Sequence, residues 1–147
     1  MSVNTLQTTV QADEERGMLA LLSEEDKTVM YCSMIAETDE QRKSLFKAMN
    51  NPEHRLADFI NKKIEVVDIF AEVVQCINEE TGEITSAPRI VLIDKKGVGY
   101  QCVSKGVLSA IKKLFTIYGA PTWKTPVALE VKQLKKGVRN ILTFDVA

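Results

Sequence analysis

The stretch "GYQCVSKGVLSAIKKLF", residues 99–115, joins a short alternating strand directly to an amphipathic helix. Ser104 is a favourable N-cap residue at the junction, and Gly119 with Pro121 ends the helical pattern. Between them, apolar side chains recur at helical spacing and predict one buried stripe. The stripe consists of Val107, Leu108, Ile111, Leu114, Phe115 and Tyr118.

Strand patterns lie on both sides of this helix. Three runs rich in β-formers precede it, the first of them long, and two follow it. A polar loop centred on Thr81 and Gly82 separates the first two runs. This order, three strands, one helix and two strands, is that of an OB-fold, a five-stranded Greek-key barrel. We expect the helix to plug the open end of the barrel. The predicted strands are residues 63–77, 89–93, 98–104, 127–134 and 140–146.

The residues before Lys63 predict smaller elements. Residues 28–36, "TVMYCSMIA", favour a strand, and Thr38 begins a capping box with Gln41 for a helix that ends at Asn50. Its inward residues are predicted to be Leu45, Phe46 and Met49. Asn51 caps a second predicted helix that starts at Pro52, with Leu56, Phe59 and Ile60 facing inward. The sequence therefore predicts a mainly β protein with an N-terminal helical cap.

Residues 1–27 contain apolar side chains without a sustained period, which predicts an extended N-terminal arm ahead of one OB-fold domain at 28–147. An arm with this many apolar residues is expected to dock onto a neighbouring copy, although a self-packed or disordered end is the alternative. The residues expected to mediate self-association are Val3, Leu6, Val10, Met18, Leu19, Leu21 and Leu22.

The net charge of −1 hides an uneven distribution. Residues 1–88 hold 17 acidic and 8 basic residues, whereas residues 89–147 hold 3 acidic and 11 basic ones. This asymmetry favours a polyanion as partner of the C-terminal part, or contact between unlike parts of two copies. The alternative is that the two parts neutralise each other within one fold.

Several classes of protein are disfavoured. No apolar run is long enough to span a bilayer and no secretory signal precedes the fold, so a cytoplasmic protein without membrane contact is expected. The three cysteines Cys32, Cys76 and Cys102 predict reduced packing residues, and a single histidine, His54, makes a metal site improbable. No phosphate-binding loop or catalytic triad pattern is present, so neither an enzyme nor a cofactor is expected.

A longer stretch carries a family resemblance. "DKKGVGYQCVSKGVLSAIKKLFTIYGAPTW", residues 94–123, continued by "PVALEVKQLKKGVRNILTFDV", residues 126–146, resembles the single-stranded DNA-binding proteins of phages and conjugative plasmids of Gram-positive bacteria. The resemblance extends more weakly over "NNPEHRLADFINKKIEV", residues 50–66. It implies an OB-fold that coats single-stranded DNA during replication or transfer of a mobile element, without reading sequence. Double-stranded DNA is a second candidate partner.

Binding of a single strand needs flat side chains for bases and cations for phosphates. Phe70 is either a stacking platform or a core aromatic, and Tyr100 is a stacking candidate whose alternative is a buried ring with a satisfied hydroxyl. Trp123 is expected to pack under the barrel. We expect the loops between strands two and three and between strands four and five to bring cations to one cleft. These cations are Arg89, Lys95, Lys96, Lys132, Lys135, Lys136 and Arg139. The rival function is an OB-like adaptor that docks an acidic partner protein.

Overall fold

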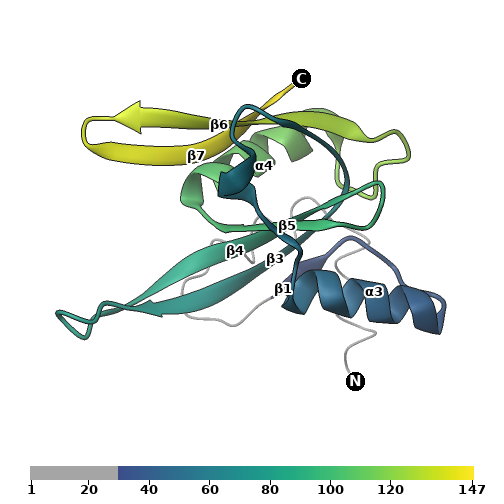
Figure 1. The fold of residues 1–147 in the computed structure, drawn as a ribbon, viewed down its shortest axis with the longest axis horizontal. Helices are drawn as coiled ribbons and strands as arrows, with labels where there is room; N and C mark the ends of the chain where they lie inside the picture. Colours follow the sequence, from purple (N-terminus) through teal and green to yellow (C-terminus); the bar gives the residue numbers. More distant parts are fainter. Residues whose placement is uncertain (1–29) are drawn as a thin grey trace.

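The computed structural model describes residues 30–147, so the predicted arm at 1–27 and its seven self-association residues lie outside the described part. Within these residues the fold is mainly β with two α-helices, and the sheet curls into a half-barrel that is consistent with an OB-like fold (Figure 1). Within the described residues the sheet has seven strands rather than five, because two short strands join it. No described helix is long and apolar enough to cross a membrane.

Five strands form the predicted meander and closing pair. Strand β3 pairs with both β4 and β6, and the order across the sheet is β2-β5-β4-β3-β6-β7. Strand β1 pairs antiparallel with β3, and β2 pairs parallel with β5, so the sheet is mixed. The strands are β1 (Met30–Cys32), β2 (His54–Arg55), β3 (Lys63–Ile77), β4 (Ile84–Asp94), β5 (Gly99–Val103), β6 (Val127–Lys136) and β7 (Arg139–Val146).

Strand β3 contains a β-bulge, which separates the part that pairs with β6 from most of the part that pairs with β4. Its register with β4 shifts between Val66 and Asp68, so two residues oppose one at this point. Ile64 and Val66 therefore face the main core before the bulge, and Ile69 and Ala71 face it afterwards. Because of the bulge, the residues that face the core do not follow one strict two-residue alternation along the whole of β3.

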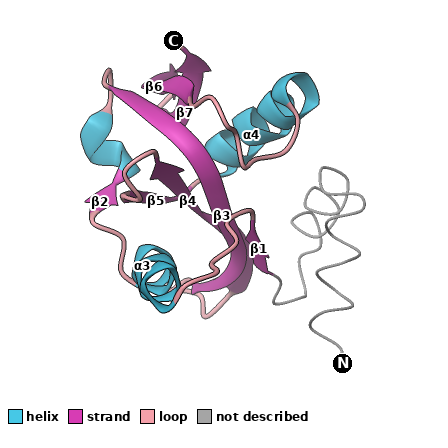
Figure 2. Ribbon diagram, turned by 90° about the vertical axis from the view of Figure 1, so that its right-hand side faces the viewer, coloured by secondary structure: helices cyan, strands magenta, loops and turns pink. Residues whose placement is uncertain are grey.

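Helix α4 (Lys105–Tyr118) lies between β5 and β6 in sequence and packs on the core face of the sheet (Figure 2). The Ser104 hydroxyl accepts from the Val107 amide at 3.1 Å, which confirms the predicted N-cap. Five of the six predicted stripe residues are buried, but Tyr118 is 47% exposed because it lies on the last turn, beyond the core. The proposed plugging role of this helix remains a prediction.

Helix α3 (Asp39–Asn50) has the predicted capping box, with the Gln41 amide 3.1 Å from the Thr38 hydroxyl. It covers the outer face of β3 and β4, where Ala48 joins Phe70, Val91 and Ile93 in a second core cluster. Phe46 was predicted to face inward, but it is 68% exposed. The second predicted helix is also different, since only a 3₁₀ turn, η1 (Leu56–Phe59), forms after β2.

The three cysteines are free thiols, as the sequence predicts. Cys32 and Cys102 are partly buried, and burial raises the pKa of the Cys102 thiol to about 12. Cys76 is exposed near the end of β3, so the prediction that it packs inside the fold is wrong.

Candidate nucleic-acid interface

The two aromatic residues proposed to stack on bases are both buried. Phe70 is 2% exposed and lies beneath α3, so it offers no ring face to a ligand in this arrangement. Tyr100 is 9% exposed and points into the main core, because its register partner Leu92 also faces that side of the sheet. For both residues, the alternative of a core aromatic describes the structure.

Tyr100 nevertheless belongs to an aromatic cluster that reaches the surface. The His54 ring stacks on Tyr100 with centroids 5.1 Å apart, and Phe59 meets both rings edge-on at 4.9 and 5.0 Å. The side chain of His54 is 39% exposed and Phe59 is partly buried. We refer to His54, Phe59 and Tyr100 as the aromatic cluster. It presents His54 and Phe59, rather than Tyr100, to solvent.

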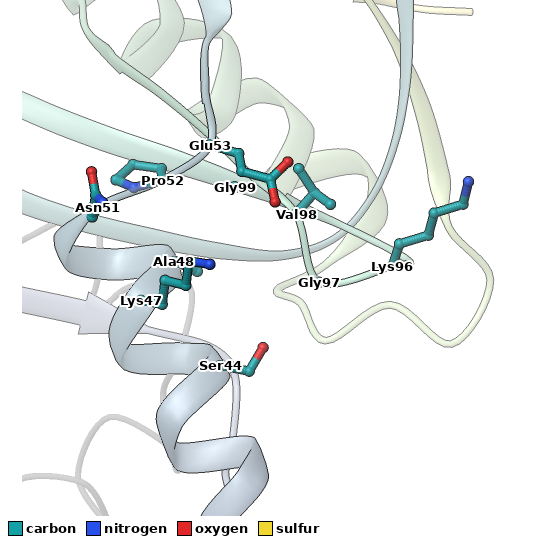
Figure 3. Close-up of a pocket in the computed structure, with 10 residues that line it drawn as sticks. All are labelled: Ser44, Lys47, Ala48, Asn51, Pro52, Glu53, Lys96, Gly97, Val98 and Gly99. Atoms are coloured by element: carbon teal, nitrogen blue, oxygen red, sulfur yellow. The ribbon is translucent and has the colours of Figure 1, made fainter.

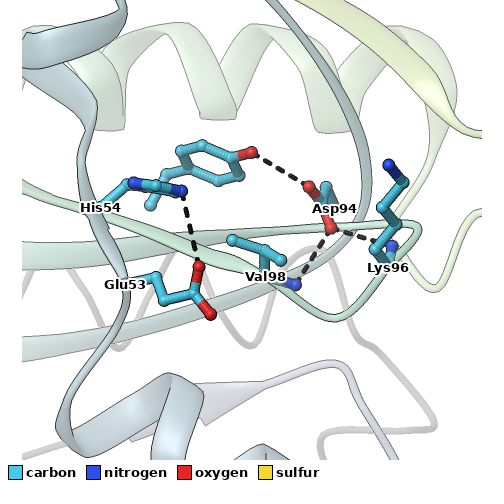
Figure 4. Close-up of polar contacts among 6 residues, drawn as sticks. Glu53, His54, Asp94, Lys96 and Val98 are labelled. Atoms are coloured by element: carbon cyan, nitrogen blue, oxygen red, sulfur yellow. Dashed lines mark hydrogen bonds and ion pairs between the residues drawn. The ribbon is translucent and has the colours of Figure 1, made fainter.

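Polar contacts hold this cluster in place (Figure 4). The Tyr100 hydroxyl donates to Asp94 Oδ2 at 3.0 Å, while Asp94 Oδ1 accepts from the Lys96 and Val98 amides. Burial, together with Asp94 and the charge of Glu53, raises the pKa of Tyr100 to about 12. The Tyr100 ring is therefore fixed in position and uncharged, and it supports the two outer rings, His54 and Phe59.

Trp123 packs under the sheet, as predicted. It is 7% exposed, its indole Nε1 donates to the Gly119 carbonyl at 3.1 Å, and its ring meets Phe115 edge-on. It is therefore part of the core that supports α4.

Lysines surround the aromatic cluster. Lys63, Lys95 and Lys96 line one hollow of about 270 Å³ together with Tyr100. The Lys62 ammonium lies 5.5 Å from the centre of the Phe59 ring, a distance at which a cation is attracted to the ring face. Lys62, Lys63, Lys95, Lys96 and Lys132 together are referred to below as the lysine track.

Strand pairing places Lys132 in the same band. Lys63 is paired with Glu130 across β3 and β6, and the Lys132 ammonium lies 3.1 Å from Glu130. Lys95 forms an ion pair with Glu65, which is only two residues along β3 from Lys63. The track therefore follows the outer face of β3 and β6 beside the aromatic cluster.

A second, smaller hollow lies next to the lysine track. It lies between the end of α3 and the β4–β5 turn, has a volume of about 190 Å³, and is lined by Lys47, Glu53 and Lys96 among others (Figure 3). The Lys96 side chain extends away from α3 in this view. Lys96 is thus directed outward at the rim of the molecule.

The predicted convergence of two basic loops on one cleft is not what the structure shows. The β4–β5 turn lies near Glu65, because the Lys95 amide donates to the Glu65 carbonyl, and Glu65 is opposite Ala128 on β6. Lys136 is eight residues further along β6, about 26 Å at about 3.3 Å per residue. Lys132, Lys135 and Lys136 therefore form a line along β6 that leads away from the β4–β5 turn, instead of a second wall beside it.

The outer end of this line is the tip of the β6–β7 hairpin. Lys135, Lys136 and Arg139 are exposed there, and none of them forms an ion pair with a carboxylate among residues 30–147. We refer to these three residues as the hairpin cations. They are therefore available to contact an external anion.

Arg89 differs from the other predicted cations. Its guanidinium donates to Glu72 at 2.9 Å and to Gln101 at 3.1 Å, it is 15% exposed, and it lies 6.0 Å from the centre of the Phe70 ring. A cation with these partners mainly braces β3, β4 and β5. The sequence predicted a contact between Arg89 and DNA. It did not point to His54, Phe59, Lys62 and Lys63, whose shared location depends on the pairing of β2 with β5.

Comparison with known proteins identifies one matching family. The model of the family described as phage single-stranded DNA-binding protein, which is named after Phi29, matches residues 24–146. No curated protein and no solved structure matches the chain. Since the family model matches most of the chain, the protein belongs to the family of phage single-stranded DNA-binding proteins.

Proposed function

We propose that the protein coats single-stranded DNA without reading its sequence, during replication or transfer of a mobile element. The phosphates follow the lysine track and the hairpin cations, and bases stack at the exposed rings of the aromatic cluster. One observation carries this proposal: Lys62 lies against Phe59, and three further lysines share a hollow with Tyr100. Cations beside flat rings are the combination that holds a single strand.

The arrangement also supports binding without sequence preference. Every base has an aromatic face that a ring can stack on, and every nucleotide carries the same phosphate. The lysine track presents ammonium groups, which bind phosphate as point charges. We therefore expect little difference between oligonucleotides of equal length.

An electrophoretic mobility shift series tests the proposal. Oligothymidines of increasing length are compared with duplexes of the same length at several salt concentrations. We expect tighter binding of the single strands and a slope of log affinity against log salt of about −0.7 for each phosphate contact. Hardly any binding of oligothymidine would favour the rival adaptor function, and equal binding of duplex would identify a general DNA-binding protein.

The proposed self-association through the arm needs its own test. Deleting residues 1–12, which include Val3, Leu6 and Val10, is expected to leave binding of short oligonucleotides intact and to give smaller assemblies on long poly-dT. Light scattering measures the assemblies. Unchanged assembly size after the deletion would exclude this segment as the link between copies.

A further inference from the structure

The β3–β4 hairpin extends from the body of the fold as a two-stranded ribbon (Figure 1). Beyond Glu72 on β3 and Arg89 on β4, neither strand pairs with any other described strand. Isolated two-stranded ribbons are only marginally stable in water, so this one gains from a surface that receives it.

The charge of the ribbon argues against DNA as that surface. Residues 73–88 contain no Lys or Arg, and Glu79, Glu80 and Glu83 lie at the tip. Carboxylates repel phosphate, whereas a loop that grips DNA in this position needs cations. A basic protein surface therefore complements the ribbon better than DNA does.

The tip also carries an apolar pair. Ile77 and Ile84 are direct partners in the register of β3 and β4, and they are 67% and 59% exposed. An isoleucine pair between carboxylates fits an apolar groove that has cations at its rim. We call Ile77, Ile84 and the three glutamates the acidic tip.

The same chain offers such a groove on its other side. Helix α4 and strands β6 and β7 enclose an open hollow of about 360 Å³. Ile117, Tyr118, Leu134 and Val146 line it and are 77%, 47%, 52% and 47% exposed, so the patch is apolar and uncovered by residues 30–147. Exposed patches of this kind mark interaction sites. We call this the α4 groove.

Cations lie at the rim of the α4 groove. Lys113 and Asp145 both line it, so the groove itself is close to neutral. Lys135 and Lys136 directly follow Leu134 on β6, and Arg139 is paired with Lys136. The excess of positive charge complements the three glutamates of the acidic tip.

We propose that the acidic tip of one copy docks in the α4 groove of a second copy. The ribbon cannot reach the groove of its own chain, because its strands continue the sheet and point away from the body (Figure 1). Each copy then contributes one tip and one groove, so the contact is head-to-tail and can be repeated from copy to copy. A repeated contact of this kind links neighbouring copies along a DNA strand, and this use of the contact rests on the coating role proposed above.

Complementary variants of the full chain test this contact. Ile77→Glu with Ile84→Glu disables the tip, and Ile117→Glu disables the groove; all three positions are more than half exposed, so the fold is expected to survive. Phe46→Glu is the matched control, since Phe46 is equally exposed on α3. Thermal melting followed by circular dichroism checks the fold of each protein.

Sedimentation velocity then measures association with and without long poly-dT. We expect wild type and the Phe46→Glu control to associate with rising concentration, and each disabled protein to have a dissociation constant raised by about tenfold or more. An equimolar mixture of tip-disabled and groove-disabled proteins retains one intact tip and one intact groove. It is expected to form pairs and nothing larger.

Three outcomes would overturn the proposal. In the first, the wild-type protein stays monomeric both free and on poly-dT. In the second, Ile117→Glu leaves association unchanged. In the third, association is lost on deletion of residues 1–27 but is retained by the tip-disabled protein. The last would identify the N-terminal segment as the occupant. Binding of a short oligothymidine by the same variants separates this question from the DNA-binding proposal, because Ile77, Ile84 and Ile117 belong to neither the lysine track nor the hairpin cations.

Discussion

The imidazole of His54 lies stacked on the phenol ring of Tyr100, with the two planes inclined by 28°. This contact joins β2 to β5, two segments that are 46 residues apart in sequence and run parallel in the sheet. It covers one face of Tyr100 and leaves His54 and Phe59 as the outer rings. The surface available for stacking is thus determined by β2 and η1 rather than by the central strand.

Removing either outer ring should weaken DNA binding. We expect Phe59→Ala and His54→Ala each to reduce the affinity for oligothymidine by about 1–3 kcal/mol, the effect of losing one stacked base. Fluorescence anisotropy of a labelled oligonucleotide measures the change. Phe46→Ala is the control because its ring is more exposed but lies on α3. Unchanged affinity in both cluster variants would remove the cluster from the interface.

Tyr100 should make stability depend on alkaline pH. Its pKa is raised to about 12 in the fold, against about 10 in the unfolded chain. Between these values the folded state holds the proton that the unfolded state has lost, so stability is full below pH 10 and falls as pH rises towards 12. The loss is about 2–3 kcal/mol. Urea unfolding at pH 9 to 11.5 measures its onset.

Tyr100→Phe is the comparison for this measurement. It lacks the titrating hydroxyl and the bond to Asp94, so we expect it to be about 1 kcal/mol less stable at neutral pH and to show a flatter decline above pH 10. Parallel curves for the two proteins would show that other groups, such as the lysines, cause the alkaline loss.

The hairpin cations should act through counterion release. Replacing Lys135 and Lys136 by Ala is expected to weaken binding of all sequences alike and to flatten the dependence of log affinity on log salt by about 0.7 for each lost contact. Lys43 and Lys47 on α3 provide a matched pair of control substitutions. A lower affinity with an unchanged salt slope would mean that the hairpin lysines act through folding or self-association.

Local signals predicted much of the fold. Strand β3 begins and ends at the predicted residues, and the capping residues Thr38 and Ser104 begin the two helices, because caps and β-branched runs act within a few residues. The burial of Tyr118 and Phe46 was predicted wrongly for a different reason. Periodicity defines a helix face, but only the extent of the neighbouring sheet decides how far that face is covered.

The candidate site was less predictable. The cations of the β6–β7 hairpin were evident from composition, but their distance from the β4–β5 turn follows from the pairing of Glu65 with Ala128. The two-residue strand His54–Arg55 has no sequence signal of its own, and its parallel pairing with Tyr100 and Gln101 is long-range. For this reason His54 and Phe59 could not be recognised as surface rings.

The last prediction concerns the contact between the start of α4 and strand β7. The Ser104 hydroxyl donates to the Leu142 carbonyl at 3.2 Å, and a Cβ added at Gly106 would lie 2.4 Å from the same oxygen and 2.7 Å from Ile141 Cγ2. The start of α4 therefore touches the backbone of β7, and only glycine permits this approach.

We expect Gly106→Ala to lower the free energy of unfolding by about 1–3 kcal/mol, the usual cost of overpacking, although alanine is the better helix former. Ser109→Ala on the exposed side of the same helix is the control and should change stability little. Urea unfolding gives both values. A stability equal to or above that of wild type would show that α4 can move away from β7 at no cost in free energy, and that glycine is not needed at this contact.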